Sequence, residues 1–180
     1  MALVVEDGTG KVDAESYASL AEYDAYLVAF SLTDADADPA KESRLREATE
    51  YLDLEYGELW TGDIANEGTE TGVDGQALDW PRSFASYSDG RAIGNTMIPI
   101  ELKRAQILLA FAAKTISLMP DIAASSSGSL VAEEVALGPL KVRERFTDSG
   151  REDTSEFVKA DRYIAPLILG GGSVGYLERG

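Results

Sequence analysis

The sequence predicts a mainly α-helical fold: a bundle of three to four helices with a small β-hairpin element and extended terminal arms. Two observations predict the helices, because apolar residues recur at three- and four-residue steps after Pro99 and again between Pro39 and Tyr56. The third observation is strand-like alternation on both sides of Gly138-Pro139, which predicts a β-hairpin over about residues 131–146.

The composition is that of a soluble globular protein, with a hydrophobic share of 44% and a charged share of 27%. A chain of 180 residues is long enough to bury its own core. We therefore expect one α-rich domain over residues 1–169 and a flexible, glycine-rich C-terminal tail over residues 170–180. No apolar run approaches the roughly 18 residues of a membrane-spanning helix, so no membrane partner is expected.

The N-terminal part is expected to hold an arm and a first helix. Residues 1–13 are interpreted as a short β-hairpin or an extended arm, because Asp7-Gly8 and Gly10 supply turn chemistry. A helix then begins at Ser19, since Ser19 and Glu22 form a capping-box pattern. The following apolar residues are expected in the core: Tyr23, Tyr26, Leu27 and Phe30.

Alternating aspartates precede the second helix and invite interpretation as a calcium-binding loop. An EF-hand loop beginning at Asp34 would need Gly at its sixth position and Glu at its twelfth, where Pro39 and Leu45 stand. We therefore interpret Asp38 as the N-cap of a helix whose first residue is Pro39. This helix is expected to run to about Tyr56 and to end at the glycine that follows.

The stretch from Gln76 to Ile116 joins an aromatic loop to the most regular helix. Pro99 suits the first turn of that helix, because its φ is fixed and it lacks an N–H. In the loop, Trp80 precedes a proline and cannot be helical. The loop aromatics are expected to pack on the helix or on a neighbouring molecule, and they are Trp80, Phe84 and Tyr87.

The C-terminal part is expected to contain a linker over residues 123–129, the hairpin, and a last helix capped by Thr154 and limited by Pro166. Residues 62–75 are polar and glycine-rich and are interpreted as a surface loop. The predicted core includes residues from three helices: Leu45, Leu52, Leu102, Leu108, Leu109, Ala112 and Leu167.

The charge is strongly acidic, because 32 Asp and Glu against 16 Lys and Arg give a net charge of −16. Nucleic-acid binding depends on neutralising phosphates, so a role in gripping DNA is disfavoured. Lys103-Arg104 and the segment from Arg143 to Arg145 are the candidate basic patches. Three interpretations of the acidity stay open: a solvated surface, adaptation to high salt, or a surface along which DNA passes without sticking.

Chemistry is also constrained by what the chain lacks, since it contains no histidine and no cysteine. Gly171 to Gly175 matches the string of a nucleophile elbow, and Gly170 to Gly175 that of a dinucleotide-binding loop. Neither has the required strand, helix or base partner, so both are interpreted as coincidences of a glycine-rich tail. We expect no enzymatic activity, no cofactor and no metal site.

Short sequence pieces in a fixed order carry a resemblance to a known family. The most specific piece is Gln-x-Leu-x-Trp-Pro-Arg, from Gln76 to Arg82. The other pieces are Val5 to Gly10, Ala14 to Tyr17, Asp24 to Tyr26, Ala48-Thr49, Tyr51 to Asp53, Trp60 to Gly62, Ile98-Pro99, Lys103 to Ala105, Val135, Gly138 to Val142 and Ala165 to Leu167. In these pieces the chain resembles the tailed-phage proteins labelled DnaT-like single-stranded-DNA-binding proteins, which look like head–tail adaptor (head-completion or connector) proteins.

This resemblance implies a structural virion protein at the phage neck. Its subunits would form a homo-oligomeric, dodecameric ring between the portal protein and a neck or tail-completion protein. DNA would pass through the channel without sequence-specific binding. The protein would be assembled in the host cytoplasm and reside at the portal vertex of the virion. The candidate structural or interface residues are Trp60, Gln76, Trp80, Pro81, Arg82, Pro99, Arg143, Arg145 and Tyr176.

The alternative is the function that the family label names, a single-stranded-DNA-binding accessory protein of replication. Such a protein needs a basic groove with aromatic side chains on which bases stack. The sequence supplies the aromatics, whereas a basic groove is not visible in it. A helical scaffold without any DNA contact is the third hypothesis.

Overall fold

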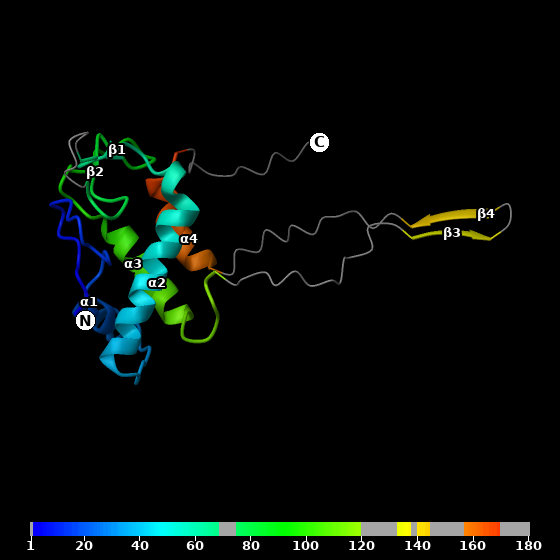
Figure 1. Ribbon diagram of the computed structural model, residues 1–180, viewed down its shortest axis with the longest axis horizontal. Coiled ribbons are helices and arrows are strands. Elements are labelled where there is room, and N and C mark those ends of the chain that lie inside the picture. Colours follow the sequence, from blue (N-terminus) through cyan, green and yellow to red (C-terminus); the bar gives the residue numbers. More distant parts are fainter. Residues whose placement is uncertain (1, 69–74, 120–132, 138–139, 145–156, 170–180) are drawn as a thin grey trace. The chain divides into compact units, whose positions relative to one another are not determined.

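The computed structural model describes residues 2–68, 75–119, 133–137, 140–144 and 157–169 (Figure 1). The chain divides into two units, one formed by residues 1–119 with 157–180 and one by residues 120–156. The predicted fold class is confirmed, because the structure is mainly helical with a small antiparallel hairpin. Among the described residues, no helix is long and apolar enough to cross a membrane.

Helix α1 spans Leu20–Ala29 and begins as the sequence predicts. The N-cap hydroxyl of Ser19 accepts the Glu22 N–H at 3.2 Å, and the Glu22 carboxylate accepts the Ser19 N–H at 2.7 Å. Tyr23, Tyr26 and Leu27 are buried as expected. Phe30 does not belong to the core, because it follows the last turn of α1 and is 50% exposed.

Helix α2 spans Asp38–Tyr56 and starts one residue earlier than predicted, so that Ala37 is the N-cap. The preceding aspartates serve charge pairing: Arg44 binds both Asp34 and Asp36, and Lys114 binds Asp34 at 2.7 Å. Although burial alone would raise it, these cations and the Tyr23 hydroxyl hold the pKa of Asp34 well below its usual range. These aspartates thereby fasten the connection between α1 and α2.

Gly57, which follows α2, was expected to end the helical segment, but the chain remains helical there. Gly57 has φ −50° and ψ −45°, which is right-handed helical geometry, and it opens the 3₁₀ helix η1 at Gly57–Leu59. A short sheet follows in the segment interpreted as a loop: β1 (Asp63–Ile64) pairs antiparallel with β2 (Arg82–Ser83).

Helix α3 spans Ile100–Ala112 and packs against α2 on one side and α4 on the other. Figure 1 shows α2 in front of α3. Pro99 is the N-cap residue and not part of the first turn. Of the predicted core, Leu108 and Ala112 are only half-buried, because the two packing faces of α3 leave them at its edge. The other predicted members are confirmed as buried: Leu45, Leu52, Leu102, Leu109 and Leu167.

Gln106 is the polar side chain at the centre of this core and is fully buried. Its carbonyl oxygen accepts the Ala18 N–H at 2.7 Å. The two hydrogens of its amide nitrogen serve three acceptors, so that one is shared: Ser16 Oγ at 2.6 Å, Thr49 Oγ1 at 2.7 Å and the Leu45 carbonyl at 3.0 Å. One side chain of α3 therefore connects the N-terminal segment to α2.

The N-terminal segment is neither a hairpin nor a free arm. Val5 forms an isolated parallel bridge with Ser16, and the Glu6 N–H donates to the Ser16 carbonyl at 2.8 Å. The buried Glu6 carboxylate accepts the N–H groups of Gly8, Gly10 and Lys11. Because these N–H groups bind a side chain, they cannot form the ladder that a hairpin requires.

Helix α4 spans Val158–Ile164 and continues into the 3₁₀ helix η2 at Ala165–Leu167, which contains Pro166. The expected cap at Thr154, the linker over residues 123–129 and the tail over residues 170–180 lie outside the described residues. In the second unit, β3 (Glu133–Leu137) pairs antiparallel with β4 (Leu140–Glu144), which confirms the predicted hairpin.

We predict that Leu102→Ala lowers the free energy of unfolding by about 2–5 kcal/mol, because Leu102 is fully buried between packed helices. Leu108→Ala should cost clearly less, since the same methylene groups are removed from a half-buried position. Urea denaturation of both variants measures the difference. Equal losses would show that the two leucines are buried alike.

Candidate nucleic-acid interface

The Gln-x-Leu-x-Trp-Pro-Arg loop is held by hydrogen bonds to its own backbone. Gln76 Nε2 donates to the carbonyls of Leu78 and Pro81, at 2.7 and 2.9 Å. The Arg82 guanidinium donates to the carbonyls of Thr61, Gly62 and Asp79. Gln76 therefore shapes the loop from within, and Arg82 also fastens it to the Thr61-Gly62 segment that follows η1.

The two tryptophans are buried below this loop. Trp60 is 2% and Trp80 0% exposed, and their rings meet edge-on with centroids 6.0 Å apart. Tyr87 is half-buried, and its hydroxyl donates to Glu101 on α3 at 3.1 Å. Phe84 is 84% exposed, so it does not pack on the helix as the sequence interpretation allowed. None of the buried tryptophan surface is free to stack with a base.

Pro81 and Pro99 are also buried, so the candidate residues of the first unit are mainly structural. Arg143 lies in β4, where the structure describes the backbone alone. Arg145 and Tyr176 lie outside the described residues. The structure thus brings together the candidates from Trp60 to Arg82 and does not place the three C-terminal ones at a site.

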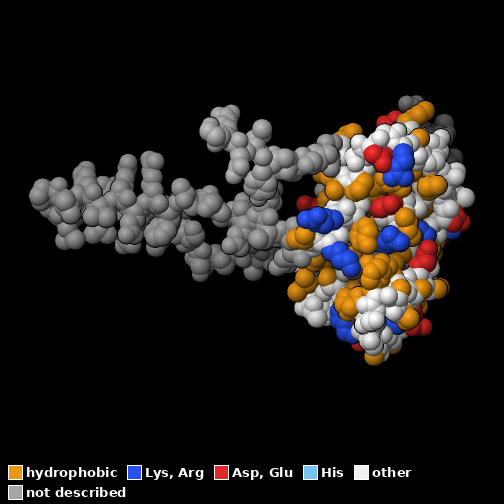
Figure 2. Space-filling model, turned by 180° about the vertical axis from the view of Figure 1, so that it is seen from behind, with side chains coloured by type: hydrophobic (Ala, Val, Ile, Leu, Met, Phe, Trp, Pro, Cys, Tyr) orange, Lys and Arg blue, Asp and Glu red, His pale blue; other side chains and the backbone are white. Residues whose placement is uncertain are grey.

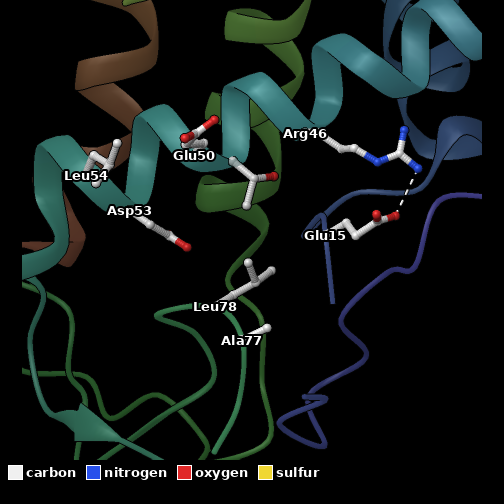
Figure 3. Close-up of a pocket in the computed structure, with 8 residues that line it drawn as sticks. Glu15, Arg46, Glu50, Asp53, Leu54, Ala77 and Leu78 are labelled. Atoms are coloured by element: carbon white, nitrogen blue, oxygen red, sulfur yellow. Dashed lines mark hydrogen bonds and ion pairs between the residues drawn. The ribbon is translucent and has the colours of Figure 1, made fainter. Parts of the chain in front are cut away.

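A cavity of about 390 Å³ lies between α2 and the same loop (Figure 3). Asp53 and Glu50 reach it from α2, Leu78 from the loop, and Glu15 binds Arg46 across one end at 2.9 Å. Glu15 and Glu50 against one paired arginine give this cavity a negative character, which Asp53 increases when it is ionised. It is unsuited to a phosphate backbone.

The Asp53 carboxyl, which lines this cavity, has a strongly raised pKa. Burial raises its pKa to about 7, the neighbouring Asp79 charge adds to this rise, and the hydrogen bond from the Tyr17 hydroxyl opposes it. Burial also raises the pKa of Asp79, although the Trp60 indole N–H donates to its carboxylate at 3.2 Å. Asp53 on α2 and Asp79 in the loop thus lie close together where the loop packs on α2.

A second surface combines aromatic rings with cations and is formed by α1, α3 and α4. We refer to it as the cationic face, and its residues are Tyr26, Phe30, Lys103, Arg104, Lys159 and Tyr163. Figure 2 shows the side of the molecule away from α2, where hydrophobic side chains gather with Lys and Arg side chains among them. Among the described residues, no group of His, Cys, Asp and Glu side chains is arranged to hold a metal ion.

The cations of this face lie on rings. Lys159 Nζ lies 4.8 Å from the centroid of Phe30 and 6.0 Å from that of Tyr26. The Arg104 guanidinium lies 5.8 Å from the centroid of Tyr163. In the part of the chain that the structure describes, Arg104 and Lys159 form no ion pair with a carboxylate. Their charges are therefore available to an anionic ligand.

Sequence reasoning found only part of this face. It singled out Lys103-Arg104 as a basic patch and correctly interpreted Tyr26 as a core residue, but it also assigned the half-exposed Phe30 to the core. Lys159 lies on a helix whose cap was expected elsewhere, so its position opposite Phe30 was not foreseen. The available signal was the four-residue spacing of Tyr26 and Phe30, whose rings stack with centroids 4.5 Å apart at the end of α1.

The fold and this face define a small helical protein with paired aromatic and cationic side chains on its surface. The model of a family described as "Putative DnaT-like ssDNA binding protein" matches residues 1–180. The chain belongs to this family. Neither the search of curated proteins nor the search of solved structures found a match.

The family match corrects the head–tail adaptor that the resemblance implied. The family description names binding to single-stranded DNA, and nothing in it indicates a virion component, a portal partner or a dodecameric ring through which DNA passes. It agrees with the alternative function. The adaptor hypothesis rested on the resemblance, and the net charge of −16 that accompanied it does not exclude a local basic patch such as that of Arg104 and Lys159. The virion location and the absence of enzymatic activity stay predictions.

We predict a pH-dependent stability from Asp53. The folded carboxyl keeps its proton up to about pH 7, against an ordinary pKa of 3.8, so its contribution to the free energy of unfolding is full below about pH 4. That contribution is lost as the pH rises through about 7. Between about pH 5 and 8, wild-type stability should therefore fall relative to that of Asp53→Asn, measured by urea denaturation.

The control for this experiment is Asp89→Asn. Asp89 is exposed, and its hydrogen bonds with Arg91 lower its pKa. Its titration therefore changes the free energy of unfolding only below this pH window. Its profile should run parallel to that of the wild type. A parallel profile for Asp53→Asn as well would show that Asp53 is ionised in the folded protein throughout.

Proposed function

We propose that this protein binds single-stranded DNA through the cationic face. The observation that carries the proposal is the pairing of cations and accessible rings: Lys159 over Phe30, and Arg104 over Tyr163. Proteins that bind single strands without sequence preference combine positive charge along the backbone with aromatic rings on which bases stack. The family description supports the same ligand.

The side chains of this face would contact different parts of the strand. Arg104 and Lys159 are exposed and would contact phosphates. The half-exposed ring of Phe30 would offer a stacking surface to an unpaired base. Bases in a duplex are already stacked, so this arrangement favours single strands over double strands.

The acidic remainder of the chain limits where a strand can lie. Several cations outside this face are neutralised: Lys41 by Asp24 at 2.9 Å, Arg46 by Glu15 at 2.9 Å, and Arg44 by two aspartates. A polyanion is attracted where cations exceed carboxylates and repelled elsewhere. Binding should therefore be confined to one face and should weaken steeply as salt is added.

We predict that the double variant Arg104→Glu/Lys159→Glu binds a labelled single strand at least tenfold more weakly than the wild type. The slope of log affinity against log salt should become shallower by roughly 0.7 for each phosphate that the variant no longer binds. Fluorescence anisotropy at several salt concentrations measures both quantities.

The matched control is Arg91→Glu. Arg91 also lies over a tyrosine ring, that of Tyr87 at 4.5 Å, but it belongs to the loop after β2 and pairs with Asp89. This variant should bind as the wild type does. Equal losses in the control and the double variant, or no binding by the wild type, would contradict the proposal.

We also predict that Phe30→Ala weakens binding by about 1–3 kcal/mol, the usual contribution of one base–aromatic stack. Stability should hardly change, because the ring is half exposed. Val28→Ala serves as the control, since Val28 is 78% exposed on the same helix and points away from Tyr26. If Phe30→Ala binds like Val28→Ala, the ring does not stack with a base.

A further inference from the structure

A small cavity of about 280 Å³ opens beside the cationic face, between α1 and α3. Ala25 and Tyr26 line it from α1, and Ile100 and Ile107 line it from α3. Lys103 and Arg104 stand among the lining residues, with Lys103 bound to Glu22 at 2.7 Å across the two helices. The cavity therefore shares Tyr26, Lys103 and Arg104 with the proposed binding surface.

The walls of this cavity are apolar and its mouth is cationic. Ile107 is buried, whereas Ile100 is 51% exposed and Ala25 lies open to solvent. An isolated apolar cavity would suit a hydrophobic ligand. Glu22, which also lines the cavity, neutralises Lys103, whereas Arg104 keeps its charge, and this favours an anionic ligand that carries a flat, weakly polar group.

Tyr26 contributes its ring to the cavity wall. Its hydroxyl is closed off from solvent and lies near that of Tyr163. Burial, together with this neighbouring hydroxyl, raises the pKa of Tyr26 to about 12, so the hydroxyl keeps its proton at neutral pH. The part of Tyr26 that a ligand in the cavity can contact is therefore the ring.

We propose that this cavity holds one unstacked nucleobase of the bound strand. The two isoleucines and the ring of Tyr26 contact the base, and Arg104 binds a flanking phosphate. The volume is just below the usual range of ligand pockets, which begins at about 300 Å³, and so suits one base rather than a stack. This inference rests on the proposed single-strand binding and adds where a base is held.

The test fills the cavity without changing any charge. Ala25→Leu places a larger side chain on the exposed lining position, where leucine is a good helix former. Ala40→Leu makes the same change at an exposed position near the start of α2 and is the matched control. Thermal denaturation followed by circular dichroism confirms that both variants fold.

Two oligonucleotides of equal length are compared by anisotropy: a thymidine strand, and one with abasic sites that keeps every phosphate. Both strands are measured with the Phe30→Ala variant as the background protein, so that stacking on Phe30 does not contribute to the affinity. We expect this protein to bind the thymidine strand at least fivefold more tightly than the abasic strand. Adding Ala25→Leu should reduce the ratio to near one while the salt dependence stays, and adding Ala40→Leu should leave the ratio unchanged.

The outcomes separate the cavity from the binding surface. If both strands bind equally before Ala25 is changed, or if Ala25→Leu leaves their ratio intact, the cavity does not hold a base, although salt-dependent binding would still support the proposed function. If wild-type protein binds neither strand, the proposed function fails, and the cavity proposal fails with it.

Discussion

The buried amide of Gln106 fixes how the first unit is assembled. Its hydrogen bonds reach the N-terminal segment and α2 from the centre of α3. It accepts from the buried Ala18 N–H and donates to the hydroxyls of Ser16 and Thr49, which themselves donate to the carbonyls of Ala18 and Leu45. A side chain with both donors and an acceptor is needed to complete this network. This requirement sets the rotation of α3 about its own axis.

The rotation of α3 in turn decides which residues reach the surface. With 3.6 residues per turn, Ile100, Arg104 and Ile107 lie more than a quarter turn away from Gln106. They therefore face away from α2 and toward α1 and α4. The same geometry that buries the amide thus brings Arg104 to Tyr163 and opens the cavity beside Tyr26.

Charge distribution, more than net charge, accounts for the proposed chemistry of this acidic chain. Asp34, which is paired with cations, precedes α2, and the buried Asp53 lies on α2. Glu22 is paired with Lys103 at the edge of the cationic face. Arg104 and Lys159 rest on rings instead. Within the described residues, the cations that are not paired with carboxylates on the proposed binding surface are thus Arg104 and Lys159.

The sequence predicted the helices and hairpin well because their signals are local. The capping box of Ser19 and the apolar spacing around Leu45 and Leu102 need no distant partner. The bonds of Glu6 and Gln106 could not be predicted, since a lone polar residue in a helix or turn gives no sign of the tertiary partners that bury it. The interface was missed for the same reason: Lys159 meets Phe30 across a long sequence separation.

The most direct test is a titration of isotopically labelled protein with a short thymidine oligonucleotide, followed by amide chemical shifts. The account predicts that the perturbed amides cluster on the ends of α1, α3 and α4 that carry Phe30, Arg104 and Lys159, with those around Asp53 unchanged. Perturbations centred on the Gln76–Arg82 loop and the Asp53 cavity, or none at saturating oligonucleotide, would contradict it.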